Sequence, residues 1–302
     1  MPPILANKPG LPLNVHVLLL LLVTLVWGAT FPVLKLATAQ LSGVETSALR
    51  FAIAAVCMLP WVWRAPSSTW RDGGLLGALV LLSYVLQAYG LQTISSNRSA
   101  ILTSLNVLMV PLMGMALGNA LSMRVLVAAA LACLGIGLMS WEGGADLLAD
   151  AATVAGAAGY ALYVILLSQR AARHAARSLA ATQIVWMAAL GLAWMLVDAI
   201  GTDRLHTLPE RMNWDIFAGL CYLGIVATAG MLFVQAIAQR HVSADKAAVI
   251  YAMEPVFAAL FAWLWLTEVL SLRAALGGAV VVGAVLLSEW GSGATPPPDA
   301  GR

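Results

Sequence analysis

Long apolar stretches follow one another along this sequence from residue 13 to residue 289. Each is close to the roughly 20 residues that an α-helix needs to cross the hydrocarbon core of a bilayer. The composition agrees, because 61% of the 302 residues are hydrophobic and only 10% are charged, with a mean hydropathy of +0.89. Soluble domains carry about 25% charged residues, and no soluble core could bury this much apolar surface. The sequence therefore predicts an all-α integral membrane protein.

We expect ten transmembrane helices in two groups of five. Their approximate positions are 13–37, 43–63, 72–92, 97–119, 122–140, 150–169, 179–199, 214–238, 244–266 and 271–289. A signal peptide is the competing interpretation of the first segment, but its apolar region would run for only about 7–15 residues. The expected organisation is a flexible N-terminus (1–12), a first five-helix repeat (13–140), an external connection (141–149), a second five-helix repeat (150–289) and a flexible C-terminus (290–302).

The distribution of lysine and arginine predicts the orientation, because cytoplasmic loops of membrane proteins carry an excess of both. With a cytoplasmic N-terminus, ten of the sixteen basic residues fall on the cytoplasmic side, five fall on the other side, and Arg50 lies within the second span. The acidic connection then falls outside. We therefore expect both termini in the cytoplasm.

The second half of the sequence repeats the first. Residues 94–108 align with residues 242–256 at an offset of 148, which pairs Arg98 with Lys246 and Asn106 with Glu254. Five spans in each half is an odd number, so equivalent helices must cross the membrane in opposite directions. Such inverted repeats are typical of transporters, whose binding sites lie near the bilayer midplane where the repeats meet.

Glu254 is an ionisable residue in the middle of an apolar segment, and Pro255 directly after it cannot donate a hydrogen bond to the helix. A carboxylate at this depth needs a partner, a wet cavity or a substrate. The alternative is a structural carboxylate, hydrogen-bonded to a neighbouring helix or capping the half-helix after the proline. Both interpretations stay open here.

Other polar and aromatic side chains lie within the predicted spans where they could face a central cavity. Gln87 follows Tyr84 by three residues and Asn106 follows Thr103 by three, so each pair shares one helix face. The candidate substrate-binding residues are Trp27, Thr30, Tyr84, Gln87, Thr103, Asn106, Tyr160, Tyr163, Gln235, Tyr251 and Glu254. A packing or interfacial role is the simpler interpretation of any single tyrosine or tryptophan. Their polar partners at matching repeat positions favour a cavity for a zwitterionic or polar organic solute.

Two basic residues leave several interpretations open. Lys35 and Arg50 lie near the ends of spans or inside them, so they could snorkel to the membrane surface, pair with Glu45, or present positive charge to an anionic solute.

The sequence resembles a known family of carriers. The segment VSADKAAVIYAMEPVFAALFAWLWLTEVLSLR, its first-half partner SSNRSAILTSLNVLMVPLMGMALGNALSMR, WGATFPVLKLA in the first span and LRF at 49–51 resemble the EamA-type, ten-helix branch of the drug/metabolite transporter superfamily. One departure is Gly118-Asn119, where the family often has Gly-Glu. The resemblance implies a carrier of small metabolites in the bacterial inner membrane, often an exporter, with a cavity between two inverted halves. Some relatives export amino acids, and others handle further metabolites or toxic organic compounds.

We therefore expect a secondary transporter, not an enzyme, that exports small metabolites, most of all amino acids, by alternating access. A proton-coupled multidrug or organic-cation exporter is the alternative, with Glu254 as the candidate proton carrier, and uniport stays open. An intramembrane enzyme and a channel are weaker alternatives. The spans carry no HExxH, GxSxG or P-loop motif of an intramembrane or ATP-driven enzyme, and no rings of charge or filter sequence of a channel. Expected partners are the small-molecule substrate and the lipid bilayer. We expect a monomer without cofactor, metal site or nucleic-acid partner.

Overall fold

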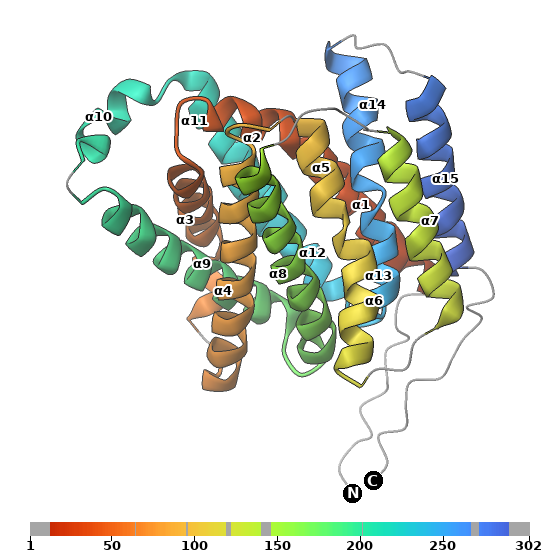
Figure 1. Ribbon diagram of the computed structural model, residues 1–302. Helices are drawn as coiled ribbons and strands as arrows, with labels where there is room; N and C mark the ends of the chain where they lie inside the picture. Colours follow the sequence, from red (N-terminus) through yellow and green to blue (C-terminus); the bar gives the residue numbers. More distant parts are fainter. Residues whose placement is uncertain are drawn as a thin grey trace, which may run out of the picture.

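The computed structural model describes residues 13–63, 65–94, 96–118, 122–139, 146–200, 202–266 and 272–289. Within these ranges every regular element is a helix (Figure 1). The predicted flexible ends and residues 140–145, which include most of the predicted external connection, lie outside the described residues.

The helices of the first half are α1 (Leu13–Gly28), α2 (Thr30–Thr38), α3 (Gly43–Val62), α4 (Ser67–Gly90), α5 (Ser96–Ser104), α6 (Asn106–Ala116) and α7 (Met123–Met139). Those of the second half are α8 (Leu147–Ala171), α9 (Ala176–Asp198), α10 (Arg204–Arg211), α11 (Trp214–Cys221), the π-helix η1 (Tyr222–Gly230), α12 (Met231–Ala238), α13 (Ala244–Tyr251), α14 (Glu254–Leu266) and α15 (Leu272–Glu289).

The predicted all-helical, multi-span architecture is confirmed, whereas the number of ten spans stays a prediction. Six helical stretches among the described residues are long and apolar enough to cross a bilayer: Val15–Thr38, Gly43–Val62, Ser67–Gly90, Leu147–Ala171, Ala176–Asp198 and Trp214–Ala238. Three further apolar helices are shorter: Leu102–Ala116, Met123–Leu138 and Ala275–Ser288. The short helix α10 was not predicted, because its sequence RLHTLPER is too polar and too short for a span.

Two of the predicted spans are broken at equivalent positions of the repeat. The helix of the first half is interrupted at Leu105, between α5 and α6, and that of the second half at Ala252 and Met253, between α13 and α14. Pro255 explains part of the second break, because it has no N–H to donate to the carbonyl of Tyr251. At the offset of 148, Leu105 corresponds to Met253, so both halves contain the same discontinuous helix.

Equivalent helices of the two halves pack against one another, α3 against α9 and α7 against α15. The two interrupted helices pack crosswise, with α6 against α13 and α5 against α14. In Figure 1 the chain descends from α5 to α6 and rises from α13 to α14, so these paired segments run in opposite directions. This antiparallel arrangement agrees with the predicted inverted relation of the halves.

Glycines allow close contact between the halves. On α4, an added Cβ at Gly77 would lie only 2.5 Å from the carbonyl oxygen of Gln183 on α9. On α8, an added Cβ at Gly156 would lie 2.9 Å from the carbonyl oxygen of Ser83 on α4. Small residues at helix contacts let backbones approach closely within membranes. Helix α4 of the first half is thereby held against α8 and α9 of the second.

Candidate functional site

A narrow cavity lies between the two halves of the chain. Its walls are formed by Trp27, Thr30, Arg50, Ser83, Tyr84, Gln87, Thr103 and Asn106 of the first half and by Gly156, Ala157, Tyr160 and Glu254 of the second. Its free volume is only about 30 Å³, whereas ligand pockets commonly measure about 300–1,000 Å³. In this conformation the cavity is therefore too small for a solute much larger than water.

The structure brings eight of the eleven candidate residues together around this cavity. These eight are Trp27, Thr30, Tyr84, Gln87, Thr103, Asn106, Tyr160 and Glu254. All eight line the same cavity, and their role in binding stays a prediction. The remaining three, Tyr163, Gln235 and Tyr251, are buried and lie behind the wall.

A hydrogen-bonded layer behind the wall fixes Tyr160 in place. The Tyr163 hydroxyl donates to Gln235 Oε1 at 3.2 Å, and Gln235 Nε2 donates to the Tyr160 hydroxyl at 3.1 Å. The Tyr251 ring lies beside Tyr160 and beside Trp27, with ring centroids 6.3 and 5.8 Å apart. These three residues therefore position the wall instead of forming it.

Further hydrogen bonds hold the wall itself. Gln87 Nε2 on α4 donates to Thr103 Oγ1 on α5 at 3.1 Å. Trp27 Nε1 on α1 donates to the carbonyl oxygen of Ala227 on η1 at 2.8 Å, which ties the two halves together. The Thr30 hydroxyl donates to the Trp27 carbonyl oxygen at 2.7 Å, next to the break between α1 and α2.

Asn106 and Glu254 are the first residues of the two half-helices α6 and α14. The N-terminal end of a helix carries a partial positive charge from its unpaired N–H groups. The Asn106 Oδ1 atom is buried and has no hydrogen-bond partner among the described residues. Within the same residues, no hydrogen bond or ion pair to the Glu254 carboxylate is found. Of the two interpretations of Glu254, the wet cavity is therefore the one that the geometry favours.

Arg50 also lines the cavity, as one of its three predicted alternatives required, although it was not among the candidate substrate-binding residues. The residue is only 4% exposed, and its Nε and Nη2 atoms donate to Thr228 Oγ1 at 3.3 and 3.0 Å. Its guanidinium carbon lies 5.1 Å from the ring centroid of Phe51 and 4.7 Å from that of Tyr84. The sequence signal was an arginine well inside a predicted span. Ser83 was missed as well, because a single serine in a span carries no pattern.

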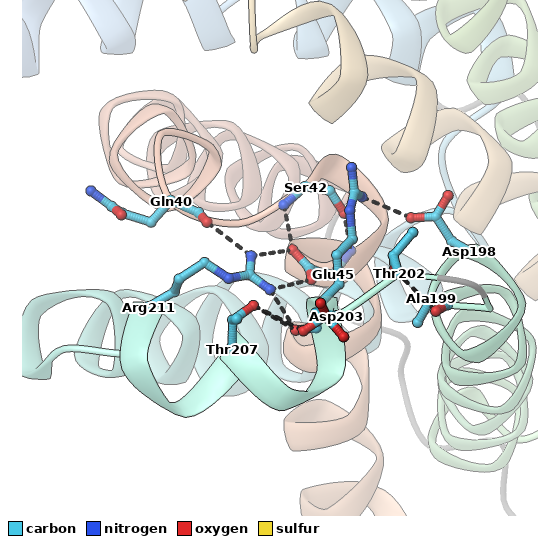
Figure 2. Close-up of polar contacts among 10 residues, drawn as sticks. Gln40, Ser42, Glu45, Asp198, Ala199, Thr202, Asp203, Thr207 and Arg211 are labelled. Atoms are coloured by element: carbon cyan, nitrogen blue, oxygen red, sulfur yellow. Dashed lines mark hydrogen bonds and ion pairs between the residues drawn. The ribbon is translucent and has the colours of Figure 1, made fainter.

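Lys35 and Glu45, which the sequence analysis considered together with Arg50, have partners outside the cavity. Glu45 pairs with Arg211 of α10, through contacts of 2.9 and 2.7 Å, and not with Arg50 (Figure 2). Lys35 Nζ donates to the carbonyl oxygens of Leu91 and Ile94 at 2.6 and 3.0 Å, just beyond the end of α4.

Polar contacts join the halves at both ends of α8. Near its start, Arg98 forms a bidentate contact with Asp150 at 2.7 and 2.5 Å. At its end, Asp72 of α4 pairs with Arg170 and lies 2.7 Å from His174 Nε2. The cavity lies between these two sets of contacts along α8. Across the described part of the chain, no three His, Cys, Asp or Glu side chains gather to hold a metal ion.

An apolar helical bundle of two related halves around a buried polar cavity defines the class of multi-span membrane transporters. The chain belongs to the EamA-like transporter family, whose model matches residues 14–141 and 147–290. The expected family is thus confirmed, and the two matches correspond to the two repeats.

Individual relatives agree with this assignment. Two uncharacterized transporters of Archaeoglobus fulgidus are each 25% identical, one over 284 residues that cover 90% of this chain and 96% of the relative, the other over 271 residues that cover 89% and 83%. The uncharacterized transporter YdfC of Bacillus subtilis is 37% identical over 78 residues, or 25% of this chain and 26% of YdfC. A solved crystal structure shares the fold with a TM-score of 0.70 at 19% identity, covering 91% of this chain and 95% of that one.

Proposed function

We propose that this membrane transporter is a secondary carrier that exports small polar metabolites, most of all amino acids, across the bacterial inner membrane. The observation that carries the proposal is the cavity itself, which takes side chains from both repeats. Its lining combines amide, hydroxyl and aromatic groups with one buried cation and one carboxylate. Such a surface suits a small solute that carries both charges and some apolar area.

The arrangement of contacts along α8 supports alternating access. The Arg98–Asp150 contact lies near one end of the helix, and the Asp72–Arg170 contact lies at the other. Opening the cavity toward one side requires the contacts at that end to separate while those at the other end persist. The helix breaks before Asn106 and Glu254 supply flexible points beside the cavity, as in carriers built from inverted repeats.

The remaining parts of the proposal follow from the sequence. The excess of basic residues on one side supports cytoplasmic termini. An exporter would then take up its solute at the cytoplasmic end of α8, where Arg170 lies. We propose a monomer as the working unit, since the cavity is formed within one chain. Proton coupling through Glu254 is compatible with this scheme, and so is uniport.

Counterflow into proteoliposomes tests the proposal. Vesicles loaded with one unlabelled amino acid should accumulate the same labelled amino acid, and vesicles without protein should not. The screen covers neutral and aromatic amino acids, a sugar phosphate and a lipophilic cation, each with and without a pH gradient. Exchange of amino acids supports the proposal. Movement of the sugar phosphate or the cation alone contradicts it.

A second candidate function is export of organic cations. Glu254 shares the cavity with the aromatic rings of Trp27, Tyr84 and Tyr160, and aromatic faces beside a carboxylate attract cations. Arg50 in the same cavity opposes a lone cation. Transport of the lipophilic cation that depends on a pH gradient would favour this candidate.

A further inference from the structure

Two opposite charges line one cavity without forming an ion pair, Arg50 buried and Glu254 partly exposed. Arg50 comes from α3 and Glu254 from the start of α14, and both line the same narrow space. The hydrogen bonds of Arg50 run to Thr228, and no contact between the Arg50 guanidinium and the Glu254 carboxylate is found among the described residues. The Tyr84 side chain lines the same cavity as both charges, and its ring centroid lies 4.7 Å from the Arg50 guanidinium carbon. Since neither charge is neutralised by the other, each can pair with a ligand when the cavity widens.

Arg50 is held in a fixed orientation that leaves donors free. A guanidinium has five N–H donors, and two of them share the hydroxyl oxygen of Thr228. Thr228 is itself fixed, because its hydroxyl donates to the Leu223 carbonyl oxygen at 2.7 Å within the π-helix η1. The rings of Phe51 and Tyr84 complete the support of the guanidinium. A planar fork held in this way is suited to a carboxylate.

Glu254 has the complementary chemistry. It begins α14, and its carboxyl group lines the cavity. Charges without partners are costly in a membrane, so an incoming ammonium group gains a strong interaction there. The neighbouring rings of Trp27 and Tyr160 add an attractive aromatic surface for a cation.

We propose that Arg50 binds the carboxylate, and Glu254 the ammonium group, of a zwitterionic α-amino acid. This inference rests on the proposed transport of amino acids and names how that cavity selects them. A zwitterion gives each of the two charged side chains a partner and leaves the net charge of the cavity unchanged. An amine pairs with Glu254 alone and a carboxylic acid pairs with Arg50 alone, so each leaves one of the two charged side chains without a partner.

Three solutes that differ by one charged group test the inference on the unaltered protein. L-phenylalanine carries both groups, phenethylamine lacks the carboxylate, and 3-phenylpropionate lacks the ammonium. Each is measured as a competitor of the counterflow of a labelled amino acid and as a ligand that raises the thermal stability of the purified protein. Charge-assisted hydrogen bonds are strong enough that phenylalanine should bind about 10- to 100-fold more tightly than either analogue.

Variants assign the two ends of the solute. Arg50→Gln should lower the affinity for phenylalanine to that for phenethylamine and leave phenethylamine binding unchanged or better. Glu254→Gln should lower the affinity for phenylalanine to that for 3-phenylpropionate and leave 3-phenylpropionate binding unchanged or better. Arg204→Gln is the matched control, because Arg204 forms an exposed ion pair with Asp198 away from the cavity. It should preserve the full preference for the zwitterion.

The inference and the proposed function fail in different ways. If amino acids exchange but the unaltered protein binds phenethylamine as tightly as phenylalanine, the charge assignment is wrong and the proposed transport of amino acids stands. Equal losses of affinity for all three solutes in Arg50→Gln would also overturn the charge assignment. If no amino acid exchanges, both proposals fall. The comparison of analogues on the unaltered protein decides the matter even if Arg50→Gln does not fold.

Discussion

The ion pair between Glu45 and Arg211 offers a sharp test of how the structure is held together. Glu45 occupies the first turn of α3, where its carboxylate accepts from the Ser42 backbone N–H at 2.7 Å while Ser42 Oγ accepts from the Glu45 N–H. Arg211 at the end of α10 donates to both carboxylate oxygens and to the carbonyl oxygens of Gln40 and Arg204 (Figure 2). One arginine thus fastens α10 to the connection between α2 and α3.

The expected cost of losing this arginine follows from burial. The Glu45 side chain is only 4% exposed, and that of Arg211 is 25% exposed. Removing one partner of a fully buried ion pair costs about 3–5 kcal/mol. Water reaches part of Arg211, and the Ser42 N–H still serves the carboxylate, so we expect Arg211→Gln to cost about 2–3 kcal/mol. For a chain of this size that corresponds to a fall in melting temperature of roughly 4–10 °C.

Thermal unfolding of the purified protein in detergent measures this effect, with Arg204→Gln as the control on the same helix. The Arg204–Asp198 pair is 48% and 38% exposed, and exposed pairs contribute at most about 1 kcal/mol. Adding Glu45→Gln to Arg211→Gln should restore part of the loss, because no buried charge is then left alone. Equal melting temperatures for Arg211→Gln and Arg204→Gln would refute the reasoning.

Three further predictions concern packing, transport and pH. Gly77→Ala should lower the melting temperature because its Cβ would meet α9 at 2.5 Å, whereas Gly137→Ala, with nothing within 4 Å, should raise it slightly. Glu254→Gln should fold but transport poorly or without pH dependence. An unaltered transport rate and pH profile in well-folded protein would contradict a role of this carboxylate in transport. Hydrogen bonds, first from the Thr93 hydroxyl and then from backbone N–H groups, lower the pKa of Asp146. The carboxylate of Asp146 therefore contributes its full stabilisation of the folded state above its ordinary pKa, and this stabilisation is lost as the pH falls through the lower folded value. The melting temperature of Asp146→Asn should accordingly depend less on pH below roughly pH 4.

The sequence predicted the helices well because their lengths are set by the bilayer. The interruptions were harder to predict. Pro255 indicated the break before α14. The equivalent helix of the first half is interrupted at Leu105, which has no proline or glycine directly beside it. The π-helix η1 and the short helix α10 likewise depend on tertiary contacts that no local pattern encodes, such as the bond from Trp27 to Ala227.

The cavity was predictable where the repeat placed polar residues at matching positions, as with Asn106 and Glu254. It was not predictable where a partner lies far along the chain. Arg50 had three possible roles in the sequence, and its actual partner, Thr228, lies 178 residues away. Tyr163 and Gln235 were predicted to line the cavity, but both are buried outside its lining and hydrogen-bond to each other.

The positions of Arg50 and Glu254 also suggest why a zwitterion would be carried and not only bound. Helix α3, which holds Arg50, packs mainly against α9, η1 and α4, whereas α14, which begins with Glu254, packs mainly against α1 and α5 (Figure 1). A ligand shifts a conformational equilibrium only by its difference in affinity between the two states. A solute that contacts both charges gains most when these two groups of helices close around it, whereas an amine or an acid contacts one group and gains little from closure. Selection of the substrate and closure of the cavity would then depend on the same pair of side chains.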